Sequence, residues 1–431
     1  MKKSQPFLLS ILSVLIFVVI TGCMSMNIGD KGAIRGRVFG DNGPLQGVRV
    51  EAGDQVAFTN DAGDFLLENV SSGAQYVFFS FEGYTGALVK VTVVKGNEVP
   101  ISSDGSVTLS LSSDNNDYEY LVSIYQLGFY EKSFLDSEKY IKEFTGSNLI
   151  PNVLFIKGAS AYYLGDYQTS LSILKDMVKS YPDNEFADDG QYLLARCLGQ
   201  GLNQWWDSIN EYKNLIQNYP QSEFVGVAYY EMGDCYYILE SYSNASVAYD
   251  QARVFGGEIE KKSIYGLAHC FYKLELFYKA ASLFAEYVQK YPNDEFADDA
   301  QYFEGASWYR RDDYQQALEA FDKSIVQYPT GTWYNGILIA PASMFNKGLC
   351  LEKLGRYSEA YQVYLDIIRK YPGAKWADGT SLISNAQYRI ELLKDAREME
   401  FAVSGDFGKC IQRNVIHIIL VDIFEYLLEF L

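Results

Sequence analysis

The chain has 431 residues, of which 48% are hydrophobic, so it can bury a sizeable core and form more than one domain. Its formal net charge of −19 disfavours binding to nucleic-acid backbones and anionic lipid surfaces, and favours partners with basic segments. Because the chain has only two histidines and no Cys-x-x-Cys pair, we expect no metal site and no cofactor.

The first 22 residues have the pattern of a secretory signal. Two lysines precede an apolar run over residues 7–20, which is too short to span a membrane, and Cys23 follows. In this respect the sequence resembles bacterial lipoproteins, in which the cysteine becomes the first mature residue and carries the lipids. The resemblance implies lipidation of Cys23 and a tether over residues 23–33. The alternative is an ordinary cleaved signal (1–22) with an incidental cysteine.

Met24 follows the cysteine, at the position where an aspartate would change the sorting of enteric lipoproteins. By resemblance to those proteins, the chain is expected at the outer membrane, lipid-anchored on the periplasmic face. The cell surface and the outer leaflet of the cytoplasmic membrane are the alternatives, because the sorting rule varies among bacteria.

Residues 34–112 have the composition of short strands separated by turns, which predicts a small antiparallel β-sandwich. Asp61 and Asp64 offer too few oxygens for a calcium loop, so a hairpin turn is the simpler interpretation. Residues 113–117 are expected to be a linker. Four segments carry a family pattern: residues 36–38, 44–50, 59–65 and 83–84. They resemble the carboxypeptidase regulatory-like domain, a seven-stranded, transthyretin-like sandwich found on bacterial envelope proteins.

One phrase recurs in the next part of the chain. Residues 181–189 are Tyr-Pro-Asp-Asn-Glu-Phe-Ala-Asp-Asp, residues 291–299 are nearly identical, and weaker copies begin at Tyr219, Tyr328 and Tyr371. Intervals of 37, 38 and 43 residues are typical of stacked helical repeats. The proline would close one helix pair, and the paired aspartates would suit the positive end of the next helix. The residues placed to cap that helix are Asn184, Ser222 and Asp294.

Small and large residues recur at fixed distances before each closing proline. The residues 24 and 12 positions earlier are small, and the residue eight positions earlier is large. Small residues would let two helices approach closely, and large ones would fill the groove between helix pairs. The pattern is carried by Gly158, Ser170 and Leu174; by Ala268, Ala280 and Phe284; by Gly305, Ala317 and Phe321; and by Gly348, Ala360 and Tyr364. Gly233, Ala245 and Tyr249 continue it without a proline, and Ala195, Ser208 and Tyr212 fit with a one-residue slip.

This pattern resembles the tetratricopeptide repeat; the best single match is made by Gly305, Trp308, Ala317, Phe321 and Pro329. The resemblance implies about seven helix pairs and a partial one over residues 118–395. The Tyr-Pro phrase is especially similar to the repeat lipoprotein of the β-barrel assembly machinery (BamD) and to Tol-Pal-associated repeat proteins. This chain departs from BamD in having more repeats and a sandwich. The expected fold is multidomain, β plus all-α: a small antiparallel β-sandwich followed by an α-solenoid.

Four cysteines occupy one equivalent position in successive repeats, two residues after a small residue. They are Cys197, Cys235, Cys270 and Cys350. Neighbouring packed helices lie roughly 8–10 Å apart, whereas a disulfide needs Cα atoms within about 7 Å. We therefore expect buried thiols that pack as small hydrophobic groups.

In tetratricopeptide superhelices the first helix of each pair lines the concave groove, so its aromatic residues are the candidate partner-binding site. Three residues before each small residue stand Phe155, Tyr192, Tyr230, Tyr265, Tyr302 and Phe345. Four residues after it stand Tyr162, Tyr237, Tyr272 and Tyr309. Aromatic rings with a polar tip suit peptide capture, but the same rings could instead pack between neighbouring helices. His269 and Arg310 are expected near this face, and His269 is either a pH-sensitive contact or a structural residue.

Residues 396–431 are predicted to form a loop and an amphipathic C-terminal helix from Asn414. The helix would cap the open end of the solenoid or, alternatively, dock to a membrane partner.

No arrangement of residues suggests catalysis, since there is no phosphate-cradling glycine loop and the two histidines are far apart. We therefore expect a protein that is not an enzyme. The leading hypothesis is an outer-membrane-anchored scaffold that binds other envelope proteins or peptides in cell-envelope assembly or maintenance, contacts the membrane through Cys23, and binds no nucleic acid. The alternative is a surface lipoprotein that binds a glycan or nutrient for delivery to an outer-membrane transporter.

Overall fold

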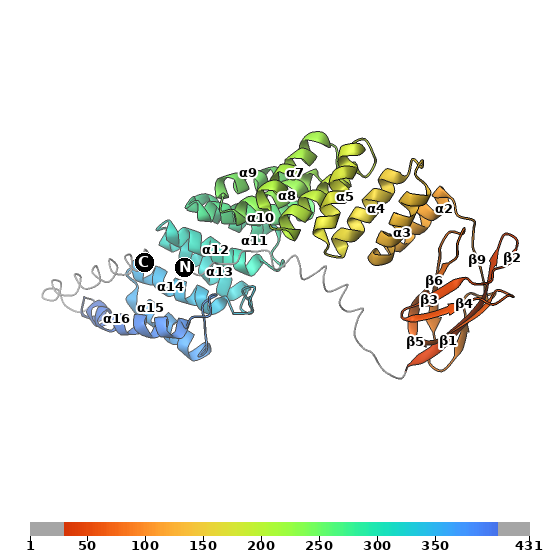
Figure 1. The fold of residues 1–431 in the computed structure, drawn as a ribbon. Helices are drawn as coiled ribbons and strands as arrows, with labels where there is room; N and C mark the ends of the chain where they lie inside the picture. The colour runs from red at the N-terminus through yellow and green to blue at the C-terminus, as the bar shows by residue number, and fades with distance from the viewer. Residues whose placement is uncertain (1–29, 404–431) are drawn as a thin grey trace. The chain divides into compact units, whose positions relative to one another are not determined.

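The structure, a computed structural model, describes residues 30–403 (Figure 1). Cys23, most of the predicted tether and the predicted C-terminal helix lie outside the described residues. The chain divides into two compact units, of which the first ends at Ala228 and the second begins at Tyr229. No helix within residues 30–403 is long and apolar enough to cross a membrane.

The β-region is a sandwich of two sheets. One sheet contains β1 (Lys31–Gly40), β2 (Gly43–Pro44), β5 (Asp64–Ser71), β8 (Glu98–Pro100) and β9 (Ser106–Thr108). The other has the order β4 (Gln55–Phe58), β3 (Arg49–Ala52), β6 (Gly73–Ser80), β7 (Ala87–Val93). All pairings are antiparallel except those of β1 with β8 and β9, which are parallel. Alternate residues of the strands fill the core, where Phe65 and Phe79 meet edge to face with ring centroids 5.7 Å apart.

The turn over residues 60–64 connects β4 of one sheet to β5 of the other. Asn60 Oδ1 accepts hydrogen bonds from the backbone N–H of Ala62 (3.0 Å) and of Asp64 (2.9 Å). Gly63 has a φ of +79°, and an added Cβ would lie 2.5 Å from the Val38 carbonyl oxygen, so only glycine fits. The Asp64 carboxylate pairs with Arg37 at 2.6 Å. The two aspartates therefore lie in a tight turn, but the predicted hairpin is wrong, because the strands on either side of the turn belong to different sheets.

Within residues 30–403, seven helix pairs and one further helix follow the sandwich, where the sequence predicted about seven pairs and a partial one. In the first unit they are α2 (Asp114–Gln126), α3 (Tyr130–Glu143), α4 (Ile150–Tyr163), α5 (Tyr167–Ser180), α6 (Ala187–Arg196) and α7 (Trp205–Asn218), with α8 (Val225–Ile238) crossing the boundary. In the second unit they are α9 (Tyr242–Ala252), α10 (Gly257–Lys273), α11 (Phe277–Lys290), α12 (Ala297–Arg310), α13 (Tyr314–Gln327), α14 (Ala340–Lys353), α15 (Tyr357–Lys370) and α16 (Leu382–Val403). A short 3-10 helix, η2 (Arg253–Phe255), precedes α10.

Close packing within each helix pair follows the predicted alternation of small and large residues. A Cβ added to Gly305 would lie 2.7 Å from the Phe321 ring, and one added to Gly348 would lie 2.5 Å from the Tyr364 ring. Leu174 occupies the same place against Gly158. The large side chains are fully buried, so each glycine is there because the opposing side chain leaves no room for a Cβ.

The extra residue between Ala195 and Ser208 in the third repeat is accommodated by a π-helix. The five residues of η1 (Cys197–Gly201) lie between α6 and α7. A single inserted residue widens the helix locally, and the backbone keeps its hydrogen bonds by shifting to the i to i+5 pattern. The repeat thereby keeps its packing: Ser208 Oγ still donates to the Ala195 carbonyl oxygen at 2.7 Å.

The chain has two similar loops, and the first of them explains the longer 43-residue interval between Tyr328 and Tyr371. Before α14 and again before α16 the chain forms a short hairpin, closed by bridges between Thr332 and Leu338 and between Lys375 and Ser381. Asn335 Nδ2 of the first hairpin donates to the Ala377 carbonyl oxygen of the second at 2.6 Å. These hairpins replace the aspartate-containing part of the Tyr-Pro phrase.

Two local predictions need correction. Asn184, Ser222 and Asp294 are not N-caps; each accepts a hydrogen bond from the backbone N–H two residues later and forms the turn before the helix. The N-caps of α6 and α12 are Phe186 and Phe296. Helix α2 begins inside the predicted linker (113–117), because the Ser113 hydroxyl accepts from the Asn116 backbone N–H and caps it.

The sandwich packs directly on the first helix pair. Phe129, at the turn between α2 and α3, meets Tyr76 and Phe78 of β6 edge to face, with centroids 5.2 and 4.9 Å apart. The Lys132 ammonium lies 5.3 Å from the centre of the Phe78 ring. The sandwich therefore covers the N-terminal end of the helical stack and shares its apolar core.

Candidate functional site

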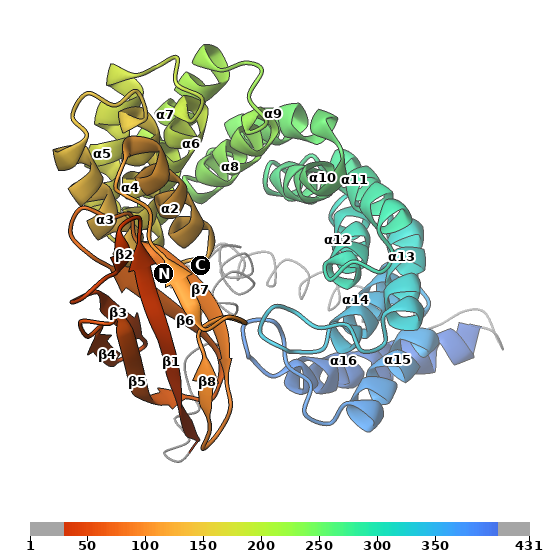
Figure 2. The same cartoon turned by 90° about the vertical axis from the view of Figure 1, so that its right-hand side faces the viewer.

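The candidate site is the inner face of the repeats. Within the second unit, Figure 2 shows α10, α12 and α14 on the inner side of the curve, with α11, α13 and α15 outside them. The first helix of each of these pairs therefore lies on the concave side, as the tetratricopeptide resemblance implies.

The first predicted aromatic row is largely occupied by packing between successive repeats. Phe155, Tyr230, Tyr265 and Phe345 are buried, and Tyr192 and Tyr302 are partly buried. Five of the six rings lie 4.7–5.2 Å, between centroids, from an aromatic ring 31 or 32 residues later in the chain. The pairs are Phe155–Phe186, Tyr192–Phe224, Tyr265–Phe296, Tyr302–Trp333 and Phe345–Trp376.

The partners in these pairs come from the Tyr-Pro phrase or from the hairpin that replaces it. The phenylalanine of the phrase is thus the residue that ties one inner helix to the start of the next. Sequence reasoning missed this role, although the recurrence of Phe186, Phe224 and Phe296 at one position of the phrase is the signal for it. Tyr230 has a different neighbour, Tyr249, at 5.7 Å, because the phrase is absent from its repeat.

The second aromatic row remains partly exposed. Tyr162, Tyr237, Tyr272 and Tyr309 each stand near the end of a first helix, and each ring meets edge to face the aromatic residue five positions later, at the start of the second helix. The four centroid distances, to Tyr167, Tyr242, Phe277 and Tyr314, are 5.5, 5.2, 5.7 and 5.6 Å. The contact fixes one edge of each ring, and part of the side chain remains open to solvent.

Arg196 joins the two rows in the first unit. Its guanidinium carbon lies 5.6 Å from the centres of both the Tyr162 and Tyr192 rings. Gln200, in the π-helix, accepts hydrogen bonds from its Nε (3.2 Å) and Nη2 (2.8 Å). The π-helix thus places the Gln200 side-chain amide where it holds the Arg196 guanidinium over the rings of Tyr162 and Tyr192.

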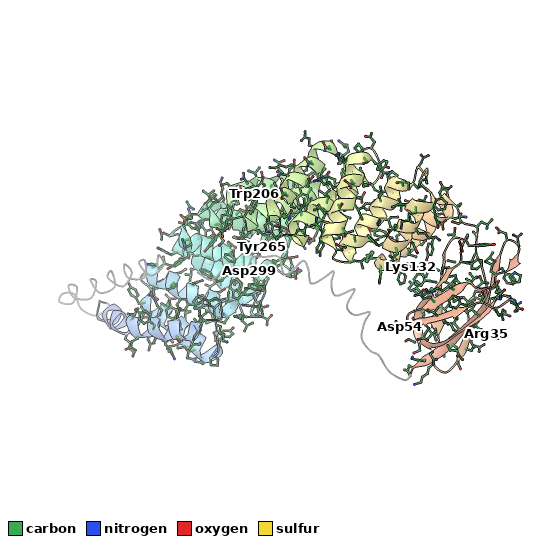
Figure 3. All side chains as sticks on the ribbon, viewed as in Figure 1. Arg35, Asp54, Lys132, Trp206, Tyr265 and Asp299 are labelled. Carbon is green, nitrogen blue, oxygen red and sulfur yellow. The ribbon has the colours of Figure 1, made fainter. Side chains whose placement is uncertain are left out.

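His269 lies inside an aromatic cluster. Its ring centroid is 4.5 Å from that of Tyr265, 4.9 Å from Phe284 and 4.7 Å from Phe303. Asp299 accepts a hydrogen bond from the Tyr265 hydroxyl and lies 3.8 Å from His269 Nε2; Tyr265 and Asp299 lie close together in Figure 3. His269 is therefore part of the packed wall, while Arg310 is exposed and lies over Phe277 at 5.4 Å.

The paired aspartates lie in the first turns of α6 and α12, as predicted. Burial nevertheless raises the pKa of Asp189, and together with the charges of Asp188 and Glu223 it brings the value to about 6. The dipole of the helix is thus not strong enough here to offset desolvation and like charge. In α12, Asp298 accepts the Thr332 backbone N–H at 2.8 Å and so anchors the first hairpin.

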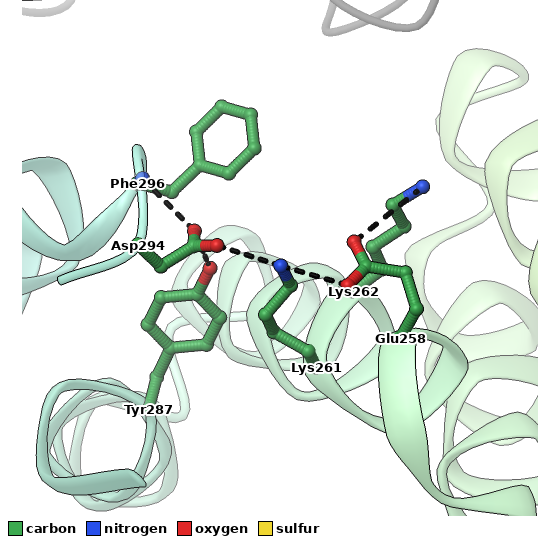
Figure 4. A network of polar contacts seen from close by, with 6 residues as sticks. All are labelled: Glu258, Lys261, Lys262, Tyr287, Asp294 and Phe296. Atoms are coloured by element: carbon green, nitrogen blue, oxygen red, sulfur yellow. Dashed lines mark hydrogen bonds and ion pairs between the residues drawn. The ribbon is translucent and has the colours of Figure 1, made fainter. Parts of the chain in front are cut away.

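Two polar clusters were not predicted. Asp234, on α8, accepts a 2.6 Å hydrogen bond from the Tyr249 hydroxyl, and burial raises its pKa to about 7. Figure 4 shows the other, in which Asp294 accepts from Lys261 Nζ (2.7 Å), from the Tyr287 hydroxyl and from the Phe296 backbone N–H (3.1 Å). This second cluster joins α10 to the start of α12. The sequence predicted other roles for two of these residues, Asp294 as a helix cap and Tyr249 as a filler of the groove between helix pairs.

The cysteines that fall within the described residues match their prediction. Cys197, Cys235, Cys270 and Cys350 are buried, and none of them forms a disulfide within residues 30–403. Burial raises the pKa of Cys197 to about 11, so the thiol stays protonated and unreactive at neutral pH. Across residues 30–403 no group of three or more histidine, cysteine or acidic side chains could hold a metal ion.

Models of the tetratricopeptide repeat match residues 152–184, 189–222, 265–332 and 342–374. The chain carries tetratricopeptide repeats. Tetratricopeptide repeats in general bind peptides or proteins, and their presence here indicates a scaffold for protein–protein interaction. No curated protein matches the chain.

Several solved structures are similar to it. A tetratricopeptide repeat protein from Parabacteroides merdae is 13% identical, covers 64% of this chain and 96% of its own, and has a TM-score of 0.39. The C-terminal part of a repeat protein from Cytophaga hutchinsonii is 14% identical, covers 62% and 100%, and has a TM-score of 0.48. YrrB, described as having an unusual peptide-binding site, is 19% identical, covers 45% and 92%, and has a TM-score of 0.37.

Proposed function

We propose that this protein is a lipid-anchored scaffold that binds segments of other envelope proteins along the inner helices of its repeats. The observation that carries the proposal is the second aromatic row, Tyr162, Tyr237, Tyr272 and Tyr309. Each ring packs edge to face on the aromatic residue five positions later, and each of the four residues is partly exposed. A tyrosine held in this way loses little conformational entropy when a partner covers it.

The envelope part of the proposal rests on the N-terminus of the sequence. A basic start, a short apolar run and Cys23 support export and lipidation, and Met24 supports retention at the outer membrane. The resemblances of the β-sandwich to the carboxypeptidase regulatory-like domain and of the Tyr-Pro phrase to BamD support a role in envelope assembly or maintenance.

Site-specific photo-crosslinking tests the binding face. A photoreactive residue at Tyr272 or Tyr309 should capture the same discrete protein in intact cells. The matched control is Val326 on α13, which is 76% exposed but belongs to the outer helices. Capture at the control position, or none at the two tyrosines, contradicts the proposal. A saturable response of tyrosine fluorescence to envelope oligosaccharides would support the glycan-binding alternative instead.

Fatty-acid labelling tests the anchor. The wild-type chain should incorporate labelled palmitate and sediment with outer membranes, and Cys23→Ser should do neither. Equal labelling of both proteins would remove the anchor from the proposal and leave the binding face untouched.

A further inference from the structure

A cavity of about 250 Å³ lies within the first unit, where the β6–β7 connection of the sandwich meets α2 and α3. The sandwich contributes residues 80–86, α2 contributes Asp117 and Tyr120, and α3 contributes Lys132, Asp136 and Glu143. The cavity therefore exists only because the sandwich is packed on the helices. None of its lining residues belongs to the inner aromatic rows.

The lining of the cavity contains more acidic than basic groups. Its four carboxylates are Glu82, Asp117, Asp136 and Glu143, and its two cations are Lys132 and Lys139. Each lysine already faces an acid one helical turn away on α3: Lys132 Nζ lies 3.3 Å from Asp136, and Lys139 Nζ lies 3.9 Å from Glu143. The cavity thus has a net formal charge of −2 from these groups.

Glu82 and Asp117 are the two acids without a cation. No ion pair within residues 30–403 involves either of them, and Asp117 accepts only a neutral donor, the Ser112 hydroxyl. Asp136 Oδ2 is buried and receives no hydrogen bond, although it is the oxygen that lies 3.3 Å from Lys132 Nζ. The resulting negative potential acts on Tyr120: burial raises the pKa of its hydroxyl, and the charges of Asp136, Glu51 and Asp117 raise it further.

The remaining walls are aromatic. The ring centroids of Phe81 and Tyr84 lie 5.7 Å apart. The Tyr120 ring packs against Gly86, where an added Cβ would lie 2.7 Å from it. Aromatic faces attract cations, and a planar guanidinium can stack on a ring while its N–H groups bind carboxylates. A volume of about 250 Å³ is below the roughly 300–1,000 Å³ of typical small-molecule sites. It suits one long side chain better than a sugar or a nucleotide.

We infer that this cavity is a socket for a single arginine side chain of a partner protein, whose guanidinium pairs with Asp117 and Glu82. The socket goes beyond the proposed groove and is independent of it, because it uses other residues and a different ligand chemistry. It also gives the sandwich a role in binding besides covering the end of the helical stack.

Calorimetric titration of the full mature chain tests the socket, with N-acetyl-L-arginine methylamide as the probe. Saturable binding with a dissociation constant on the order of 1 mM is expected, weakening as salt rises from about 50 to 500 mM. The citrulline counterpart, which has the same shape without the charge, should bind at least tenfold more weakly. The double variant Glu82→Gln/Asp117→Asn should lose at least tenfold in affinity for the arginine probe.

Glu119→Gln is the matched control, because Glu119 lies on α2 beside these residues but is exposed and does not line the cavity. It should bind the arginine probe within twofold of the wild type. Unchanged melting temperatures of both variants would show that the fold is intact. Equal binding of the citrulline and arginine probes, equal loss in Glu119→Gln, or no saturation by 50 mM would overturn the socket. A negative result for the arginine socket would not contradict the proposed binding along the inner helices, because crosslinking from Tyr272 tests a separate surface.

Discussion

The Tyr249 hydroxyl donates a hydrogen bond to Asp234 Oδ1 across 2.6 Å, and the same tyrosine ring occupies the space left by two glycines. A Cβ added to Gly233 on α8 or to Gly266 on α10 would lie 2.7 Å from this ring. Tyr249, on α9, thus packs between α8 and α10, and its hydroxyl is hydrogen-bonded to a carboxyl group that burial keeps partly protonated at neutral pH.

This arrangement predicts a pH dependence of stability. The pKa of Asp234 in the folded protein is about 7, above its ordinary value, so between roughly pH 4 and pH 7 the folded state binds more protons than the unfolded state. The free energy of unfolding therefore falls as pH rises through that window. Asp234→Asn keeps an acceptor for Tyr249 without the charge. It should be more stable than the wild type at pH 8, by on the order of 2–4 kcal/mol.

Thermal melts of both proteins from pH 5 to pH 8.5 measure the difference. Asp250→Asn, an exposed aspartate on α9, should keep the wild-type slope. If the Asp234→Asn profile runs parallel to the wild type, Asp234 does not carry the pH dependence.

Gly305→Ala should destabilise the second unit. The added Cβ would lie 2.7 Å from the fully buried ring of Phe321, which cannot move without displacing its own neighbours. Overpacking of this kind costs about 1–3 kcal/mol. Urea denaturation measures the loss. Gly146→Ala is the control, because nothing lies within 4 Å of its added Cβ and its φ is not positive; equal losses in the two variants would argue against steric packing as the cause.

Phe129→Ala should loosen the sandwich from the first helix pair. The substitution removes the ring that meets both Tyr76 and Phe78, at a cost of about 2–3 kcal/mol for a partly buried phenylalanine. Limited proteolysis should then cut near residue 113 and release the sandwich. Leu127→Ala, two residues earlier and 46% exposed, should leave the digestion pattern unchanged. A Phe129→Ala protein as resistant as the wild type would show that other contacts hold the sandwich.

Glu352→Ala should strongly destabilise the last repeat. Glu352 stands where other repeats carry the second-row tyrosine, and its Oε1 accepts from Arg389 Nε (3.0 Å) and from the Tyr364 hydroxyl (2.7 Å). Removing it leaves the Arg389 charge buried, with 8% of the residue exposed, at a cost of about 3–5 kcal/mol. Hydrogen exchange of α14 to α16 measures the loss. The control Glu391→Ala breaks the exposed pair with Lys394 and should cost under about 0.5 kcal/mol.

Much of the fold could be predicted from the sequence because each copy of the repeat makes the same packing contacts between its two helices. Gly158 and Leu174, or Gly305 and Phe321, stand 16 residues apart in each copy, and helix geometry brings them together wherever the two helices of a pair form. The same regularity places the cysteines at one buried position. Even the one-residue slip before Ser208 was visible, although its form, a π-helix, was not.

The candidate site was predicted less completely. The spacing of aromatic residues in the sequence predicted both rows. The same spacing is found whether a ring is buried between helices or exposed to solvent, so it could not distinguish the two rows. Tyr265 is 4% exposed because Phe296, 31 residues later, lies on it, whereas Tyr272 on the same helix remains partly exposed. The distinction depends on contacts between repeats, which no single repeat contains.

The sequence by itself determined the order of a β-sandwich followed by about seven helix pairs and a partial one, and it predicts an export signal before Cys23. Periodic residues encode these because secondary structure and the packing of a helix pair depend on near neighbours. Only the tertiary structure decided which tyrosines are covered, that Asp234 is held by Tyr249, and that the sandwich and α3 enclose an acidic cavity. Burial and electrostatic potential arise from residues distant in the chain, so their effects appear only once those residues are brought together.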